Sequence, residues 1–118
     1  MDIYEASRNY NIPMEILRTY ERWGLCSSIK KVMGAWQYDD QDLERLSVIM
    51  TLHDIGFTAE EVETYMRLLL EGGAADSQRL KMLNQKREQT LDQIHFKEKQ
   101  MAYLDYLRYQ IQKNQEEL

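Results

Sequence analysis

Apolar residues recur at the three- and four-residue spacing of α-helices through most of the chain, and glycine and proline divide them into segments. Up to Gly72 and Gly73, the pattern predicts short helices over residues 3–9, 14–23 and 40–54, and a fourth that begins after Thr58. The residues predicted to face inward are Ile16, Leu17 and Tyr20, then Leu43, Leu46, Ile49, Met50 and His53, then Val62, Tyr65, Met66, Leu69 and Leu70. The chain is therefore predicted to be mainly α.

The ends of these helices carry specific signals. Pro13 fits the first turn of the second helix, where its missing N–H costs nothing, and Gly24 ends that helix. Asn11 lies between the first two helices and tolerates a left-handed backbone. Thr58 is followed three residues later by Glu61, which is the pattern of a capping box for the fourth helix. Two short helices around a tight turn form a helix-turn-helix candidate.

Residues 25–38 have a different pattern, in which apolar residues flank a basic pair and a glycine turn. The residues concerned are Ile29, Lys30, Lys31, Val32, Met33, Gly34 and Trp36. Short extended segments on either side of a tight turn are typical of β-hairpins. We therefore expect a small β wing beside the helix-turn-helix.

After Gly73 the chain has no further glycine or proline, and residues 76–115 predict one long helix. Its length is about 60 Å at about 1.5 Å per residue, and Asp76 or Ser77 is placed to cap it. A helix this long with one apolar stripe needs a partner, and the simplest partner is the same helix of a second copy. The alternative is a helix folded back on its own N-terminal part. The predicted dimer interface consists of Leu80, Leu83, Leu91, Ile94, Met101, Leu104 and Ile111.

In this order of elements, three motifs resemble those of the MerR family of bacterial transcription regulators. Residues 16–25 (ILRTYERWGL) are similar to the family run T-[LI]-R-Y-Y-E-x-x-G-L. Residues 34–43 (GAWQYDDQDL) are similar to G-Y-R-x-Y-x-x-x-D-L, and residues 52–62 (LHDIGFTAEEV) to L-x-x-x-G-F-S-L-E-E-I. The resemblance covers residues 3–71.

The resemblance implies a winged helix-turn-helix DNA-binding domain over residues 1–73 and a dimerisation helix over residues 74–118, paired as an antiparallel coiled coil. It implies a homodimer in the bacterial cytoplasm that binds a palindromic promoter site in double-stranded DNA. Family members typically bend and untwist promoter DNA to realign it for RNA polymerase. Many carry an effector domain beyond the long helix, and because the sequence stops at Leu118, we expect a short form without one.

The expected DNA-binding residues lie on the second helix and in the wing. They are Met14, Glu15, Arg18, Thr19, Tyr20, Lys30, Lys31 and Trp36. Arg18 and the lysine pair would bind phosphates, although Arg18 could instead form a salt bridge with a glutamate of its own helix. Tyr20 could donate to a phosphate or pack in the core, and Trp36 could stack on a sugar or pack under the wing.

Three positions depart from the family motifs and leave a second function open. Thr19 stands where the family has the first tyrosine of a pair, and Ala35 and Trp36 replace the usual Tyr-Arg of the wing. Glu15 adds a charge that repels phosphate. The alternative is a MerR-like dimer with weakened DNA binding that acts as a protein-interaction partner of another regulator. A third hypothesis is a small-molecule sensor whose pocket is lined by Tyr103, Tyr106 and Tyr109.

The charge balance changes the picture of DNA binding. The 118 residues contain 15 Lys and Arg against 20 Asp and Glu, a net charge of -5, whereas phosphate neutralisation supplies much of the affinity for DNA. Much of the acidic charge clusters at the start of the third helix, as Asp39, Asp40, Asp42 and Glu44, where Asp39 or Asp40 caps the helix and the cluster could face away from DNA. We therefore expect weak, strongly salt-sensitive or partner-assisted DNA binding.

Other chemistry is not indicated. Cys26 is the sole cysteine, so neither a disulfide framework nor a multi-cysteine zinc site is expected, and His53 and His95 supply too few ligands for a metal. No cofactor is predicted. The chain carries no phosphate loop, nucleophile elbow or paired-carboxylate setting, so we do not expect an enzyme. No run of about 18 apolar residues occurs, so neither secretion nor membrane insertion is expected.

Overall fold

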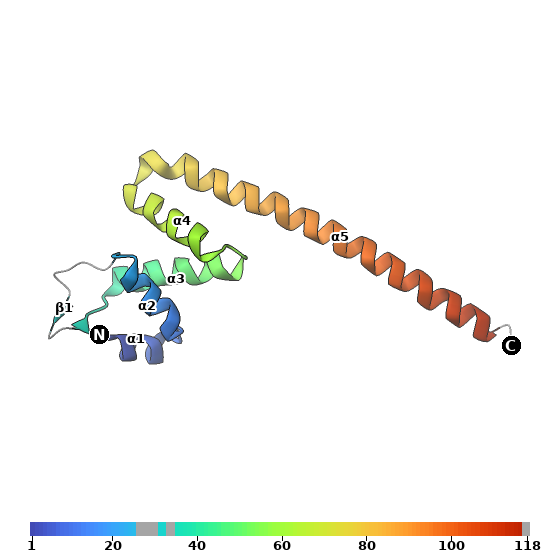
Figure 1. Ribbon diagram of the computed structural model, residues 1–118, viewed down its shortest axis with the longest axis horizontal. Helices are drawn as coiled ribbons and strands as arrows, with labels where there is room; N and C mark the ends of the chain where they lie inside the picture. The colour runs from blue at the N-terminus through green and yellow to red at the C-terminus, as the bar shows by residue number, and fades with distance from the viewer. Residues whose placement is uncertain (26–30, 33–34, 117–118) are drawn as a thin grey trace. The chain divides into compact units, whose positions relative to one another are not determined.

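The computed structural model describes residues 1–25, 31–32 and 35–116, and side chains within 1–25 and 37–116 (Figure 1). In chain order the elements are α1 (Ile3–Tyr10), α2 (Met14–Arg22), β1 (Lys31–Val32), β2 (Ala35–Trp36), α3 (Asp40–Asp54), α4 (Ala59–Glu71), the 3-10 turn η2 (Gly73–Ala75) and α5 (Asp76–Glu116). The chain divides into two compact units, Met1–Asp76 and Ser77–Leu118. The prediction of a mainly helical fold is confirmed.

The turn between α1 and α2 has the predicted backbone conformation. Asn11 has φ 54° and ψ 43°, the left-handed conformation that asparagine tolerates. Ile12 and Ser7 close the turn, since the Ile12 N–H donates to the Ser7 carbonyl and the Ser7 hydroxyl donates to the Ile12 carbonyl at 2.7 Å. Pro13 is the N-cap of α2, with an extended ψ of 135°, one residue earlier than predicted. Gly24 follows α2 with φ +72° and ends it as expected.

Two capping boxes fix the starts of α3 and α4. The Thr58 hydroxyl accepts from the Glu61 N–H at 3.2 Å, and the Glu61 carboxylate accepts from the Thr58 N–H at 2.9 Å. Asp39 and Asp42 exchange the same two hydrogen bonds at the start of α3. Because each box satisfies two amides that lack helical partners, both helices begin where the sequence predicts.

The core of the first unit lies among α1, α2, α3 and α4, with α2 packed against α1 and α3, and α3 against α4. Its buried apolar residues are Ala6, Ile12, Leu17, Tyr20, Leu25, Tyr38, Leu46, Ile49, Leu52, Phe57, Val62, Met66 and Ala75. Of the residues predicted to face inward, Leu70 is 44% exposed at the last turn of α4, so that prediction is wrong. Asp42 is completely buried, which also corrects its assignment to an acidic surface.

The predicted wing is described only in part. β1 and β2 are antiparallel strands of two residues each, with Lys31 opposite Trp36 and Val32 opposite Ala35. Residues 26–30 and 33–34 lie outside the described residues, and Cys26 and Lys30 lie among them. The side chains of Lys31 and Trp36 are likewise outside the description.

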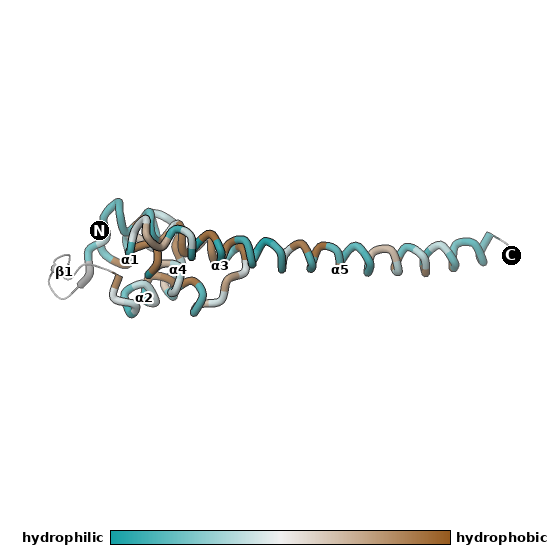
Figure 2. The backbone as a smooth tube through the Cα atoms, turned by 90° about the horizontal axis from the view of Figure 1, so that it is seen from above, coloured by the Kyte–Doolittle hydropathy of each residue, from teal (hydrophilic) through white to brown (hydrophobic). Residues whose placement is uncertain are grey.

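The second unit is a single helix, because α5 continues without interruption over 41 residues. η2 leads directly into it, so Asp76 is already helical, with φ -60° and ψ -40°. The predicted N-cap therefore lies inside the helix, and the chain turns instead at Gly72, whose φ is +84°. Figure 2 shows apolar positions recurring along an otherwise hydrophilic α5. Within the described ranges, no helix has an apolar stretch long enough to span a bilayer.

Candidate nucleic-acid interface

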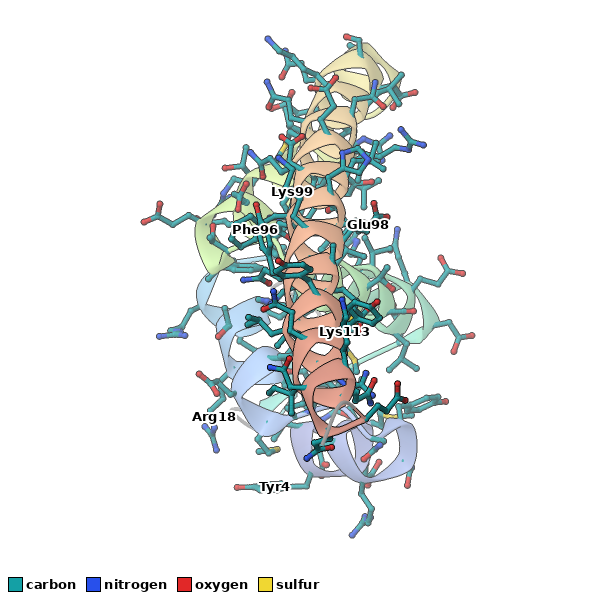
Figure 3. The ribbon with its side chains drawn as sticks, turned by 90° about the vertical axis from the view of Figure 1, so that its right-hand side faces the viewer. Tyr4, Arg18, Phe96, Glu98, Lys99 and Lys113 are labelled. Atoms are coloured by element: carbon teal, nitrogen blue, oxygen red, sulfur yellow. The ribbon has the colours of Figure 1, made fainter. Side chains whose placement is uncertain are left out.

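The amphipathic sequence of α2 separates a buried side from an exposed one. Leu17 and Tyr20 are fully buried against the core. Glu15, Arg18 and Arg22 are exposed and follow one another at i, i+3 and i+7, so they lie along one side of the helix. Figure 3 shows Arg18 pointing away from α2. Thr19, which is half-buried, lies between Arg18 and Arg22 on that side. We call these four residues the α2 stripe.

The α2 stripe carries its own hydrogen-bond network. The Thr19 hydroxyl donates to the carbonyl of Glu15 at 2.8 Å. An Nη2 of Arg22 donates to Thr19 Oγ1, also at 2.8 Å. Arg18 has no ion pair with Glu15 or Glu21 in the described part of the chain, so the alternative of a salt bridge within the helix is not what the structure has. The Arg18 guanidinium is left exposed and available to an anion.

The buried side of α2 is tied to the start of α3 by polar contacts. The Tyr20 hydroxyl donates to Asp42 Oδ1 at 2.7 Å, and both residues are fully buried. The Tyr38 hydroxyl donates to the carboxylate of Glu21, and its ring lies 6.4 Å from the Tyr20 ring, centroid to centroid. Tyr38 is itself held by the backbone of Met1, whose carbonyl accepts from the Tyr38 N–H at 2.7 Å. These contacts fix the rotation of α2 about its axis.

Two arginines hold the backbone that follows α2. Arg45 of α3 donates to the carbonyl of Leu25 at 3.3 Å. Arg67 of α4 donates to the carbonyl of Trp23 and to Glu63, both at 3.1 Å. Both accepting residues follow the last residue of α2, so the two arginines tie the segment after the helix to α3 and α4. The helix is thus anchored at its end as well as along its inner side.

The predicted DNA-binding residues fall into three groups in the structure. Glu15, Arg18 and Thr19 lie together on the α2 stripe, and Met14 is half-buried at the start of the same helix. Tyr20 is 0% exposed and donates to Asp42, so the prediction that it contacts phosphate is corrected in favour of the core. Lys30, and the side chains of Lys31 and Trp36, lie outside the described residues.

Sequence reasoning missed two residues of the site. Arg22 completes the α2 stripe, and its place seven residues after Glu15 on the same helix was the available signal. Asp42 was counted with the acidic surface cluster, and no local signal marked it as the partner of Tyr20, because 22 residues separate the two. Asp39, Asp40 and Glu44 of that cluster are exposed.

Six of the seven predicted interface residues of α5 are exposed in the single chain, and the seventh, Leu83, is half-buried. None of the helix is buried, and Leu80, Ile94, Met101, Leu104 and Ile111 are between 47% and 60% exposed. Apolar residues also occur elsewhere on its circumference. Figure 3 shows the apolar side chain of Phe96, which is 59% exposed, on one side of the helix and the charged side chain of Glu98 on the other. The second unit therefore presents apolar surface that this unit alone does not cover.

Comparison with known proteins identifies the family. The model of the MerR HTH family regulatory protein matches residues 1–69. The HTH-type transcriptional regulator AdhR of Bacillus subtilis (strain 168) is 27% identical over 93 residues, which cover 78% of this chain and 66% of AdhR. The chain spans about half the length of the other curated relatives that it matches.

Two solved structures share the fold. A MerR family transcriptional regulator from Listeria monocytogenes has a TM-score of 0.70 at 24% identity, with 90% of this chain and 81% of that chain covered. HiNmlR, a MerR family regulator lacking the sensor domain and bound to promoter DNA, has a TM-score of 0.66 at 22% identity, with 93% and 86% covered. The family match includes α1 to α3, α4 up to Leu69, and the α2 stripe. The chain belongs to the MerR family of helix-turn-helix transcription regulators.

Proposed function

We propose that this regulator acts as a homodimer that binds a palindromic promoter site, with the α2 stripe of each copy in the major groove. The observation that carries the proposal is the α2 stripe itself. Its exposed side holds Arg18, while the opposite side of the same helix is buried and hydrogen-bonded to α3. A helix whose buried side is fixed to the core and whose opposite side is exposed can contact base edges and phosphates.

A homodimer follows from the surface of α5. An isolated helix of 41 residues with exposed Ile94 and Met101 gains stability by pairing its apolar positions with those of another helix. A second copy offers the same surface, so a two-fold pairing is self-complementary. Two copies carry two α2 stripes, which is why the site would be palindromic. Distortion of promoter DNA and contact with RNA polymerase are part of the same proposal.

The remaining predicted residues take the following roles. Met14, Glu15, Arg18 and Thr19 would face base edges, and Arg18, Lys30 and Lys31 would bind phosphates. Trp36 would pack under the wing or stack on a sugar. The acidic side chains of Asp39, Asp40 and Glu44 would keep the affinity modest, and the phosphate contacts would make it strongly dependent on salt.

A selection experiment tests the proposal directly. The purified chain is incubated with a library of random-sequence duplexes at low salt, and bound duplexes are sequenced and footprinted. We expect recovery of a palindrome whose half-sites lie on one face of the duplex. A bend on binding, measured by energy transfer between the duplex ends, tests DNA distortion. Recovery of no palindromic site would contradict the proposal.

The second candidate function is that of an interaction partner for another regulator. It is favoured by the apolar side chains on more than one side of α5, such as Phe96 and Met101, each 59% exposed. A chain of this kind would form a dimer without selecting any duplex. The selection therefore separates the two functions, provided that the oligomeric state is measured on the same preparation.

A further inference from the structure

The α2 stripe contains a linked pair of side chains, Thr19 and Arg22, at its C-terminal half. Arg22 Nη2 donates to Thr19 Oγ1 at 2.8 Å, and the same hydroxyl donates to the Glu15 carbonyl at 2.8 Å. A hydroxyl has one hydrogen and two lone pairs. Its hydrogen is used by the Glu15 carbonyl, so the lone pair that receives Arg22 has a fixed direction.

The hydrogen bond to Thr19 holds the flexible side chain of Arg22 close to α2. A guanidinium has five N–H donors, of which the contact with Thr19 uses one. The rest of the Arg22 donors stay on the exposed side of α2, where Arg18 also lies. An arginine that is already oriented loses less conformational freedom when it binds an anion.

The net charge of the α2 stripe also favours a phosphate-binding role for Arg22. Without Arg22, the stripe holds one glutamate and one arginine, and their charges cancel. With Arg22 the stripe has a net charge of one positive unit. On a chain whose net charge is -5, Arg22 therefore changes the stripe from neutral to one that attracts phosphate.

We propose that Arg22 is a phosphate-binding residue of the DNA interface and that Thr19 is its positioning residue. This inference rests on the proposed function and deepens it. Thr19 stands where the MerR motif has a tyrosine, and its hydroxyl lies close enough to α2 to accept from Arg22 three residues later.

The experiment measures binding of the full chain to a mixed-sequence DNA duplex over a range of low salt concentrations, because phosphate contacts do not depend on sequence. The logarithm of the affinity falls as the logarithm of the salt concentration rises, and Arg22→Ala is expected to make this slope shallower by about 1. Arg8→Ala, which removes an exposed arginine of α1, is the matched control and should leave the slope unchanged.

The role of Thr19 is tested by a rescue pair. Thr19→Val removes the acceptor at nearly constant shape and should weaken binding about two- to tenfold, the usual worth of one hydrogen bond. Thr19→Ser keeps the hydroxyl and should restore the affinity. A mixed-sequence duplex averages out any base-specific contact of Thr19, so in the Arg22→Ala background Thr19→Val should have no further effect on this duplex. Thermal unfolding followed by circular dichroism shows that each variant is folded.

Several outcomes would overturn the inference. They are an Arg22→Ala slope equal to that of Arg8→Ala, a Thr19→Val effect that persists without Arg22, and an absence of duplex binding by the unmodified chain. If an operator is selected but Arg22→Ala leaves the salt dependence of binding unchanged, only this inference fails. If duplex binding depends on Arg22 but no palindrome is selected, the inference stands and the proposed function fails.

Discussion

The hydroxyl of Tyr20 on α2 donates to the carboxylate of Asp42 on α3 at 2.7 Å, and no part of either side chain reaches solvent. The same carboxylate accepts from the N–H of Asp39 at 3.1 Å. One buried side chain therefore serves both the start of α3 and the inner side of α2. Because the two helices share this carboxylate, the rotation of the α2 stripe depends on where α3 begins.

Removal of the Tyr20 hydroxyl should destabilise the first unit. Tyr20→Phe removes one hydrogen bond to the buried carboxylate of Asp42, which costs about 1–3 kcal/mol of unfolding free energy. Urea denaturation followed by circular dichroism measures the change. The control is Tyr10→Phe on α1, whose side chain is 51% exposed. Equal stability of the two variants would show that the buried hydrogen bond contributes nothing.

Loss of the capping box of α4 should also lower stability. Thr58→Ala removes the acceptor of the Glu61 N–H and should cost about 1 kcal/mol of unfolding free energy. Thr64→Ala is the matched control, since the Thr64 hydroxyl only donates to the Glu60 carbonyl on the exposed side of α4. The prediction fails if the urea midpoint of the Thr58 variant shifts no more than that of the control.

Neutralisation of Glu15 should strengthen binding to DNA. A carboxylate about 4 Å from a phosphate costs about 1 kcal/mol in water, so Glu15→Gln should raise the affinity for a mixed-sequence duplex about fivefold at low salt. The gain should shrink as salt is added. Fluorescence anisotropy measures the affinity, and Glu71→Gln at the end of α4 removes the same charge outside the stripe. A similar gain in both variants would assign the effect to net charge alone.

Introduction of a charge into the predicted seam of α5 should weaken the proposed dimer. Ile94→Glu would place an unpaired carboxylate among apolar side chains of the second copy, at a cost of several kcal/mol, which weakens dimerisation at least about tenfold. Sedimentation velocity over a concentration series gives the dissociation constant. Gln93→Glu adds the same charge to the neighbouring position, which is not among the predicted interface residues. If Ile94→Glu remains as dimeric as the control, the predicted seam is wrong.

The sequence predicted the helices well because their ends are set locally. The box of Thr58 and Glu61, the left-handed Asn11 and Gly24 after α2 each act within a few residues, so their effects can be read in order along the chain. The start of α5 was the exception. The sequence predicts Asp76 or Ser77 as the cap, but the 3-10 turn before Asp76 leads directly into α5 and both residues lie within that helix.

What the sequence by itself determined was the order and extent of the helices, the family motifs and the presence of Arg18 on the outer side of α2. Only the tertiary structure decided between the two predicted roles of Tyr20 in favour of the core, and showed that Asp42 is buried rather than part of an acidic surface and that Arg22 is held by Thr19. The reason is physical. Helical periodicity gives the side of a helix but not the partner that covers it, and a polar residue can be buried only where a donor from a distant segment satisfies it.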